Sequence, residues 1–103
     1  MQDERVRPAD CRTMIEVRRG VDALDAEIVK LLGERFRYMD AAARIKPERA
    51  QVRDEVRKAA VIEHARQVAA RVGFPPEVIA ELYDRLVETS IAYEFERFDA
   101  MRG

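Results

Sequence analysis

The feature that most constrains this chain is a helical hydrophobic stripe that is too long for a compact domain of its size. Between about residues 11 and 46, apolar residues recur three and four positions apart, which is the spacing of one face of an α-helix. A helix of about 36 residues would be roughly 54 Å long, whereas a compact chain of this length has a radius of gyration of about 13 Å. One chain cannot cover such a stripe, so the sequence predicts an intertwined homodimer in which the long helices pair. The members of the stripe are Val17, Val21, Leu24, Ile28, Leu31, Met39 and Ala43.

Proline and glycine mark the ends of this helix and of two more. Pro47 ends the first helix, because the residue before a proline is disfavoured in the α conformation. Asp54 is the expected N-cap of a second helix that reaches about Val72, and Gly73 is the expected residue just beyond its end. A third helix is expected from about Pro76 almost to the end of the chain. No segment alternates with period two, so the predicted class is all-α, with three helices.

The start of the long helix has two candidate caps. Asp10 is one, because an aspartate side chain can accept a hydrogen bond from the first turn. Thr13 is the other, since Glu16 follows it at the spacing of a capping box. A flexible segment, residues 1–9, is expected before the helix.

Composition and charge exclude several classes of function. The chain has 19 basic and 20 acidic residues and a net charge of -1, so no overall basic field attracts nucleic acid or an anionic membrane. Its apolar runs are too short to cross a bilayer, and its charged N-terminus lacks the apolar core of a signal peptide. The one cysteine, Cys11, fits a reducing compartment. We therefore expect a cytoplasmic protein with a single domain, residues 1–103.

Charged and polar residues lie on helix faces that should be buried. Arg35 lies on the apolar stripe and shares its helical face with Lys46. On the third helix, Ser90 and Glu94 are four residues apart and so adjacent on one side. A buried charge must be paired or must serve a ligand. One hypothesis is that the two cations pair with Glu94 and Asp54 in the dimer interface. The other is a pocket for a small dianion, in which arginine supplies a planar two-pronged donor for a carboxylate.

A second arginine favours a site that two chains share. Arg18 and Arg35 are 17 residues apart in sequence, about 25 Å along one helix. No small ligand touches both in the same chain. In an antiparallel dimer, Arg18 of one chain can approach Arg35 of the other.

The segment EVRRGVDALDAEIVKLLGERFRYMDAAARIK, from Glu16 to Lys46, resembles the first helix of the all-helical chorismate mutases and of the related isochorismate-pyruvate lyases. The shared pattern is an arginine, D-x-x-D, an I-V-x-L-L block, R-x-x-Y-M, and a lysine eleven residues after the second arginine. The likeness covers nearly the whole chain, including its three-helix order. It implies a homodimeric isomerase of the shikimate pathway, toward aromatic amino acids, that converts chorismate to prephenate without a metal or organic cofactor.

The resemblance assigns roles to the residues at matching positions. Arg35 would bind a substrate carboxylate, and Lys46 would reach a carboxylate and the ether oxygen of the bond that breaks. Glu94 would lie at the same ether oxygen. Because an ionised carboxylate there would repel the charge that develops, Glu94 is expected to work in its protonated form. Further substrate contacts would come from Arg18 of the second copy, Asp54, Arg57 and Ser90.

Some features differ between the two activities and leave the substrate open. Lys58 stands where the mutases usually have a glutamate that contacts the ring hydroxyl. The loop after Lys46 is one residue shorter than in the common bacterial mutases, as in the lyases, and PADC at residues 8–11 is also lyase-like. Asp54 and Ser90 are instead mutase-like. The leading hypothesis is a chorismate mutase. The alternatives are an isochorismate-pyruvate lyase, a mutase for an amino-substituted chorismate, and a non-catalytic helical dimer.

The remaining residues with reactive or aromatic side chains have structural interpretations. His64 is the only histidine and no second histidine or cysteine lies near it, so no metal site is expected. Cys11 has no nearby base and is interpreted as a structural thiol. The aromatic residues of YEFERF are interpreted as core or dimer contacts: Tyr93, Phe95 and Phe98.

Overall fold

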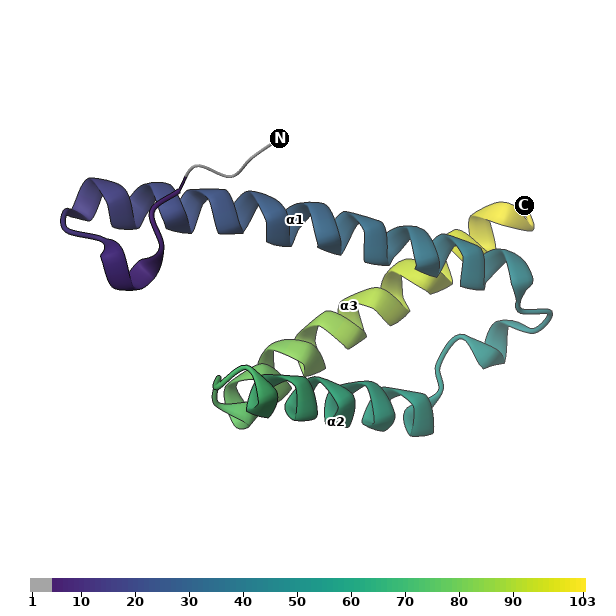
Figure 1. The fold of residues 1–103 in the computed structure, drawn as a ribbon. Coiled ribbons are helices and arrows are strands. Elements are labelled where there is room, and N and C mark those ends of the chain that lie inside the picture. Colours follow the sequence, from purple (N-terminus) through teal and green to yellow (C-terminus); the bar gives the residue numbers. More distant parts are fainter. Residues whose placement is uncertain (1–4) are drawn as a thin grey trace. The chain divides into compact units, whose positions relative to one another are not determined.

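The computed structural model describes residues 5–103, and its regular elements there are all helical (Figure 1). The α-helices are α1 (Met14–Ile45), α2 (Glu55–Arg71) and α3 (Pro76–Met101); the short 3₁₀ helices are η1 (Pro8–Asp10) and η2 (Arg49–Gln51). No strand occurs within residues 5–103, so the predicted all-α class with a long first helix is confirmed. The chain divides after Phe36 into two compact units. Residues 1–4, part of the expected flexible segment, lie outside the described residues.

In the N-terminal unit, α1 begins with the capping box that its sequence predicts. The Thr13 hydroxyl oxygen accepts a hydrogen bond from the backbone N–H of Glu16 at 3.2 Å. In return, Glu16 Oε1 accepts from the backbone N–H groups of Thr13 at 3.2 Å and Arg12 at 2.8 Å. These bonds satisfy donors that have no partner within the first turn of a helix. The first helix therefore begins at Met14.

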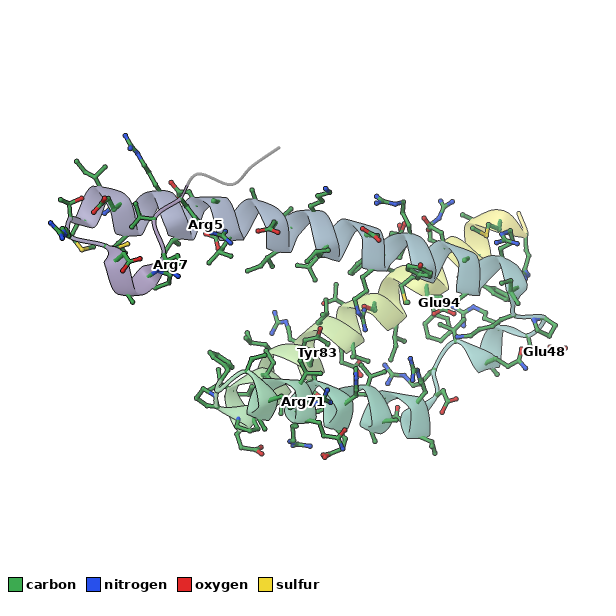
Figure 2. The ribbon with its side chains drawn as sticks, viewed as in Figure 1. Arg5, Arg7, Glu48, Arg71, Tyr83 and Glu94 are labelled. Carbon is green, nitrogen blue, oxygen red and sulfur yellow. The ribbon has the colours of Figure 1, made fainter. Side chains whose placement is uncertain are left out.

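Asp10, the other candidate cap, does not cap α1. It ends η1, and Arg7 Nη2 lies 3.0 Å from its Oδ2. Thr13, directly before Met14, is the residue that caps α1, so the Asp10 prediction is wrong. The same segment turns back along α1, since Arg5 Nη1 lies 3.5 Å from Glu27 Oε2 (Figure 2).

The part of the apolar stripe from Val17 to Leu31 is exposed in the single chain, whereas Ala43 at its end is buried. Ile28 is 52% exposed and Leu31 is 60% exposed. Val17, Val21 and Leu24 are exposed as well. A row of large apolar side chains this long favours a protein partner that covers it. The homodimer remains a prediction, and the exposed row is the reason to keep it.

In the C-terminal unit, α2 and α3 pack together after a tight turn (Figure 1). Asp54 is the N-cap of α2, as predicted. The C-terminus of α2 has the hydrogen bonds of a Schellman motif. The N–H of Gly73 donates to Ala70 O at 3.3 Å, and the N–H of Phe74 donates to Ala69 O at 2.9 Å. Gly73 has φ of 77°, a left-handed conformation that glycine adopts without strain. Pro76 then starts α3, as the sequence predicts.

The core of this unit joins the end of α1 to α3. Its buried members are Ala43, Val52, Val87, Ile91 and Phe98, and Val61, Tyr83 and Phe95 pack against them. A polar contact reinforces it: the Tyr93 hydroxyl donates to Asp40 Oδ1 at 2.7 Å, and Arg97 Nε donates to the same oxygen at 3.2 Å. The hydrogen bond to Asp40 raises the pKa of the Tyr93 phenol. Phe95 and Phe98, two of the three aromatic residues of YEFERF, thus belong to the core region, as interpreted.

Candidate active site

An open cavity of about 580 Å³ lies where the end of α1 meets the start of α2. Cavities of this size hold small organic ligands. Lys46 and Asp54, both predicted site residues, line it. The full lining is Ile45, Lys46, Pro47, Gln51, Arg53, Asp54, Glu55 and Val56.

Lys46, in the cavity wall, forms an ion pair with Glu94 of α3. Lys46 Nζ donates to Glu94 Oε2 at 2.7 Å. The Glu94 side chain, labelled in Figure 2, is only 5% exposed, whereas that of Lys46 is 30% exposed. A buried carboxylate needs a partner for its charge, and Lys46 provides one. The hypothesis that buried cations pair with carboxylates is therefore confirmed for Lys46 and Glu94. Their ion pair connects the cavity wall to the buried face of α3.

Ser90 lies one turn before Glu94 on α3 and is also buried. Its hydroxyl donates to the carbonyl oxygen of Leu86 at 2.8 Å. This bond within the helix is common for serine, and a substrate carboxylate would have to compete for the hydroxyl hydrogen.

Asp54 and Arg57 stand together at the start of α2. Asp54 Oδ1 accepts from the backbone N–H of Arg57 at 3.0 Å, so this carboxylate caps the helix while it lines the cavity. The side chain of Arg57 belongs to an exposed residue in the first turn. The N-terminus of a helix carries partial positive charge, which favours negative groups near this edge of the cavity.

A charged cluster beside them was not predicted from the sequence. Glu88 on α3 accepts from Arg53 Nη2 at 2.8 Å, from Arg53 Nη1 at 3.1 Å, and from Lys58 Nζ at 2.7 Å. Lys58 Nζ also lies 3.0 Å from Asp84 Oδ1. The hydrogen bond to Glu88 raises the pKa of Lys58. Lys58, which replaces the usual glutamate of the mutases, is therefore held by two carboxylates of α3 and is only 18% exposed.

Arg18 and Arg35 belong to the N-terminal unit, apart from the other predicted site residues. Arg18 is exposed and Arg35 is partly buried. Their place beside the cavity stays a prediction. The residues that share the C-terminal unit are Lys46, Asp54, Arg57, Ser90 and Glu94.

The residues interpreted as structural are not among those that line this cavity. His64 is exposed on α2, and the thiol of Cys11 lies 3.9 Å from the carbonyl oxygen of Val6. Within residues 5–103, no three His, Cys, Asp or Glu side chains are grouped as a metal ion would require. Among the helices of the same residues, none combines the length and apolar character needed to cross a membrane.

Comparison with known proteins identifies the family. A protein-family model described as chorismate mutase type II matches residues 17–95, about three quarters of the chain. This chain belongs to the chorismate mutase type II family. It is also similar to the isochorismate pyruvate lyase of Pseudomonas aeruginosa, with 28% identity over 96 residues that cover 93% of this chain and 95% of that protein. The resemblance stated from the sequence is confirmed. Family members are enzymes that act on chorismate-like small molecules, and the two matches name two different reactions.

The cluster around Glu88 predicts a loss of stability in acid. Hydrogen bonds from Arg53 and then Lys58 lower the pKa of Glu88 from 4.5 to about 2. A carboxyl whose pKa is lowered on folding stabilises the folded state above its unfolded pKa, and that contribution is lost as pH falls from 4.5 to about 2. We expect Glu88→Gln to melt below wild type at pH 7 and the difference to shrink toward pH 2. Thermal melts across this range measure it, with Glu81→Gln, an exposed carboxyl on the same helix, as the control. A melting difference that is equal at pH 7 and pH 2 would contradict the expectation.

Proposed function

We propose that this protein is a chorismate mutase that rearranges chorismate to prephenate in the cytoplasm, on the route to aromatic amino acids. The observation that carries the proposal is the cavity with Lys46 in its wall, in a chain that matches the chorismate mutase type II family over residues 17–95. Asp54, which is mutase-like by resemblance, lines the same cavity and favours this reaction over its relative.

The proposed reaction needs positioning and charge stabilisation more than a reactive side chain. A carbon–oxygen bond breaks and a carbon–carbon bond forms within one molecule, so no nucleophile or general base takes part. The enzyme must hold the folded conformer and stabilise negative charge as it grows on the ether oxygen. Lys46 would donate to that oxygen, and Arg35 would bind a carboxylate. Asp54 would contact the ring hydroxyl. The remaining anion contacts would come from Arg18 of a second copy, Arg57 and Ser90.

The ion pair between Lys46 and Glu94 is compatible with this role. A lysine ammonium has three hydrogens, so Lys46 can keep one bond to Glu94 and still donate to the ether oxygen. A protonated Glu94 would donate a hydrogen bond to the ether oxygen instead of repelling its charge.

A second copy of the chain completes the proposed enzyme. The exposed stripe of α1 supports pairing of two long helices, each as part of a single domain that spans its chain. Pairing would bring Arg18 of one copy to the site of the other. The site would then be shared between copies, with two sites in each dimer.

The second candidate reaction is that of an isochorismate-pyruvate lyase. The similarity to the Pseudomonas aeruginosa protein of that name favours it. Isochorismate carries the same two carboxylates, so the same cations would bind it. Its carbon–oxygen bond would break as a hydrogen moves from the ring to the departing side chain, which leaves as pyruvate while the ring becomes salicylate.

The test of function is a side-by-side assay of the purified protein with chorismate and with isochorismate. We expect prephenate from chorismate, and we expect Arg35→Ala to lower the rate by at least about a hundredfold, the usual effect of losing a charge-stabilising donor. Salicylate and pyruvate as the main products would establish the lyase instead.

Formation of neither product would favour the non-catalytic dimer. The double variant Lys46→Met/Glu94→Gln tests that alternative without leaving a buried carboxylate unpaired. A non-catalytic dimer should keep or gain stability in this variant. An enzyme should lose activity and remain folded.

The shared site predicts complementation between two inactive variants. Arg18→Ala and Arg35→Ala each remove one cation from every site of their own dimers. A mixed dimer has one site with both substitutions and one with neither. After unfolding and refolding at equal ratio, half of the dimers should be mixed, so about a quarter of wild-type activity should return. Double Arg18→Ala/Arg35→Ala protein mixed with itself is the control. No recovery, with dimers confirmed by sedimentation, would contradict the shared site.

Glu94 predicts the pH dependence of turnover. If its protonated form serves the ether oxygen, the rate should fall as the pH rises, because the carboxylate then repels the charge that develops. Glu94→Gln keeps a neutral donor at every pH and should flatten the decline. The rate at saturating chorismate between pH 4 and pH 9 measures it. An unchanged profile in Glu94→Gln would remove Glu94 from this role.

A further inference from the structure

The last turn of α1 has a carbonyl whose normal partner is missing. In an α-helix the carbonyl of Ala43 would accept from the N–H four residues later. That residue is Pro47, which has no N–H. Ala43 is 0% exposed, so bulk water does not reach it. A buried carbonyl requires a donor from elsewhere in the fold.

Arg102 supplies this donor from the end of α3. Its Nη1 donates to the carbonyl oxygen of Ala43 at 3.0 Å, and its Nη2 donates to the carbonyl oxygen of Lys46 at 2.7 Å. The guanidinium carbon lies 3.6 Å from the centre of the Phe98 ring, which is buried in the core. The planar fork of arginine can bridge two carbonyls at once, and a positive charge is favourable at a helix C-terminus.

We propose that Arg102 is a positioning residue for Lys46. The backbone N–H of Lys46 donates to Ala42 at 2.9 Å, its carbonyl accepts from Arg102, and its ammonium donates to Glu94. Lys46 directly follows the last residue of α1. Without Arg102, the Lys46 carbonyl would lose its hydrogen bond to α3, and the backbone of Lys46 would be less firmly held. The inference rests on the proposed function, because that function gives Lys46 its chemical role. A displacement of about 1 Å at a catalytic group can lower a rate by about a hundredfold.

The chain contains a matched control for this contact. Arg49 also reaches α3 with its guanidinium: it donates to Asp99 at 2.8 and 3.2 Å, and it lies 4.5 Å from the centre of the Phe95 ring. It therefore ties the segment after α1 to α3, as Arg102 does. Its two bonds go to the Asp99 carboxylate, whereas Arg102 bonds the backbone of Ala43 and Lys46, with a longer bond of 3.5 Å to the carbonyl oxygen of Phe98 on its own helix.

The experiment compares Arg102→Ala, Arg102→Lys and Arg49→Ala in the full chain, by thermal melting and by kcat and KM for the active substrate. We expect Arg102→Ala to lower kcat by at least about tenfold with a smaller change in KM, and Arg49→Ala to stay within about threefold of wild type. Arg102→Lys should recover part of kcat, since one ammonium can donate to one of the two carbonyls.

Equal losses of kcat in Arg102→Ala and Arg49→Ala at equal melting temperature would overturn the proposal, as would an unchanged kcat in Arg102→Ala. If Arg102→Ala does not fold, Arg102→Lys is compared with Arg49→Ala by the same criteria.

A second readout separates this inference from the proposed function. If the wild type converts neither chorismate nor isochorismate, the proposed function fails, and the position of Lys46 is then followed by NMR of ¹³C-labelled lysine. Arg102→Ala should shift the Lys46 Cε signal, and Arg49→Ala should leave it in place. An unshifted signal in Arg102→Ala would overturn the positioning role independently of any activity.

Discussion

The C-terminal unit depends on the charge of one buried carboxylate. Glu94 lies almost wholly within the protein, where an unpaired charge would be strongly destabilising. Lys46 meets it from the end of α1, on an element far away in sequence. The pair therefore fixes where the end of α1 lies against α3, and at the same time it keeps an ammonium group at the wall of the cavity. The same contact thus meets a structural requirement and places the group to which we assign a chemical role.

The surrounding charges repeat this arrangement on a smaller scale. Asp54 caps the N-terminus of α2 and lines the cavity, so one carboxylate serves both the helix and the cavity wall. Arg53 and Lys58, on either side of the first turn of α2, both bind Glu88. The N-cap Asp54 and the first turn of α2, which carries Arg57, thus lie between two residues that form ion pairs with Glu88. Lys58 is occupied by α3 rather than left facing the cavity, which gives its departure from the mutase pattern a structural reason.

Local signals in the sequence were sufficient for the helices. Pro47, Asp54 and Gly73 each act on neighbouring residues, so the ends that they predict agree with the structure. Asp10 is a competing local signal, and the structure decides against it because Thr13 caps α1. A resemblance over nearly the whole chain led to the family. The requirement that a buried charge be paired led to the pair of Lys46 and Glu94.

The contacts that were missed join residues without any fixed spacing in sequence. Glu88 meets Arg53 and Lys58 only because α2 and α3 pack together, and no helical periodicity relates residues 35 and 30 positions apart. Arg102 could not be linked to Lys46 from sequence for the same reason. Pro47 did carry a signal: it removes a donor from a helix that ends in the core. The sequence therefore indicates that a carbonyl of α1 lacks its helical donor, but it does not indicate that Arg102 supplies one.

The separation of these partners along the chain has a consequence for folding. The turn at Gly73 closes a short loop, so α2 and α3 can associate early. Lys46 and Glu94 are 48 residues apart, and Lys46 and Arg102 are 56 apart. Contacts across such distances form only after a large loss of chain entropy, and they slow folding. We therefore expect the cavity wall to form after α2 and α3 have paired, because its contacts close longer loops of the chain.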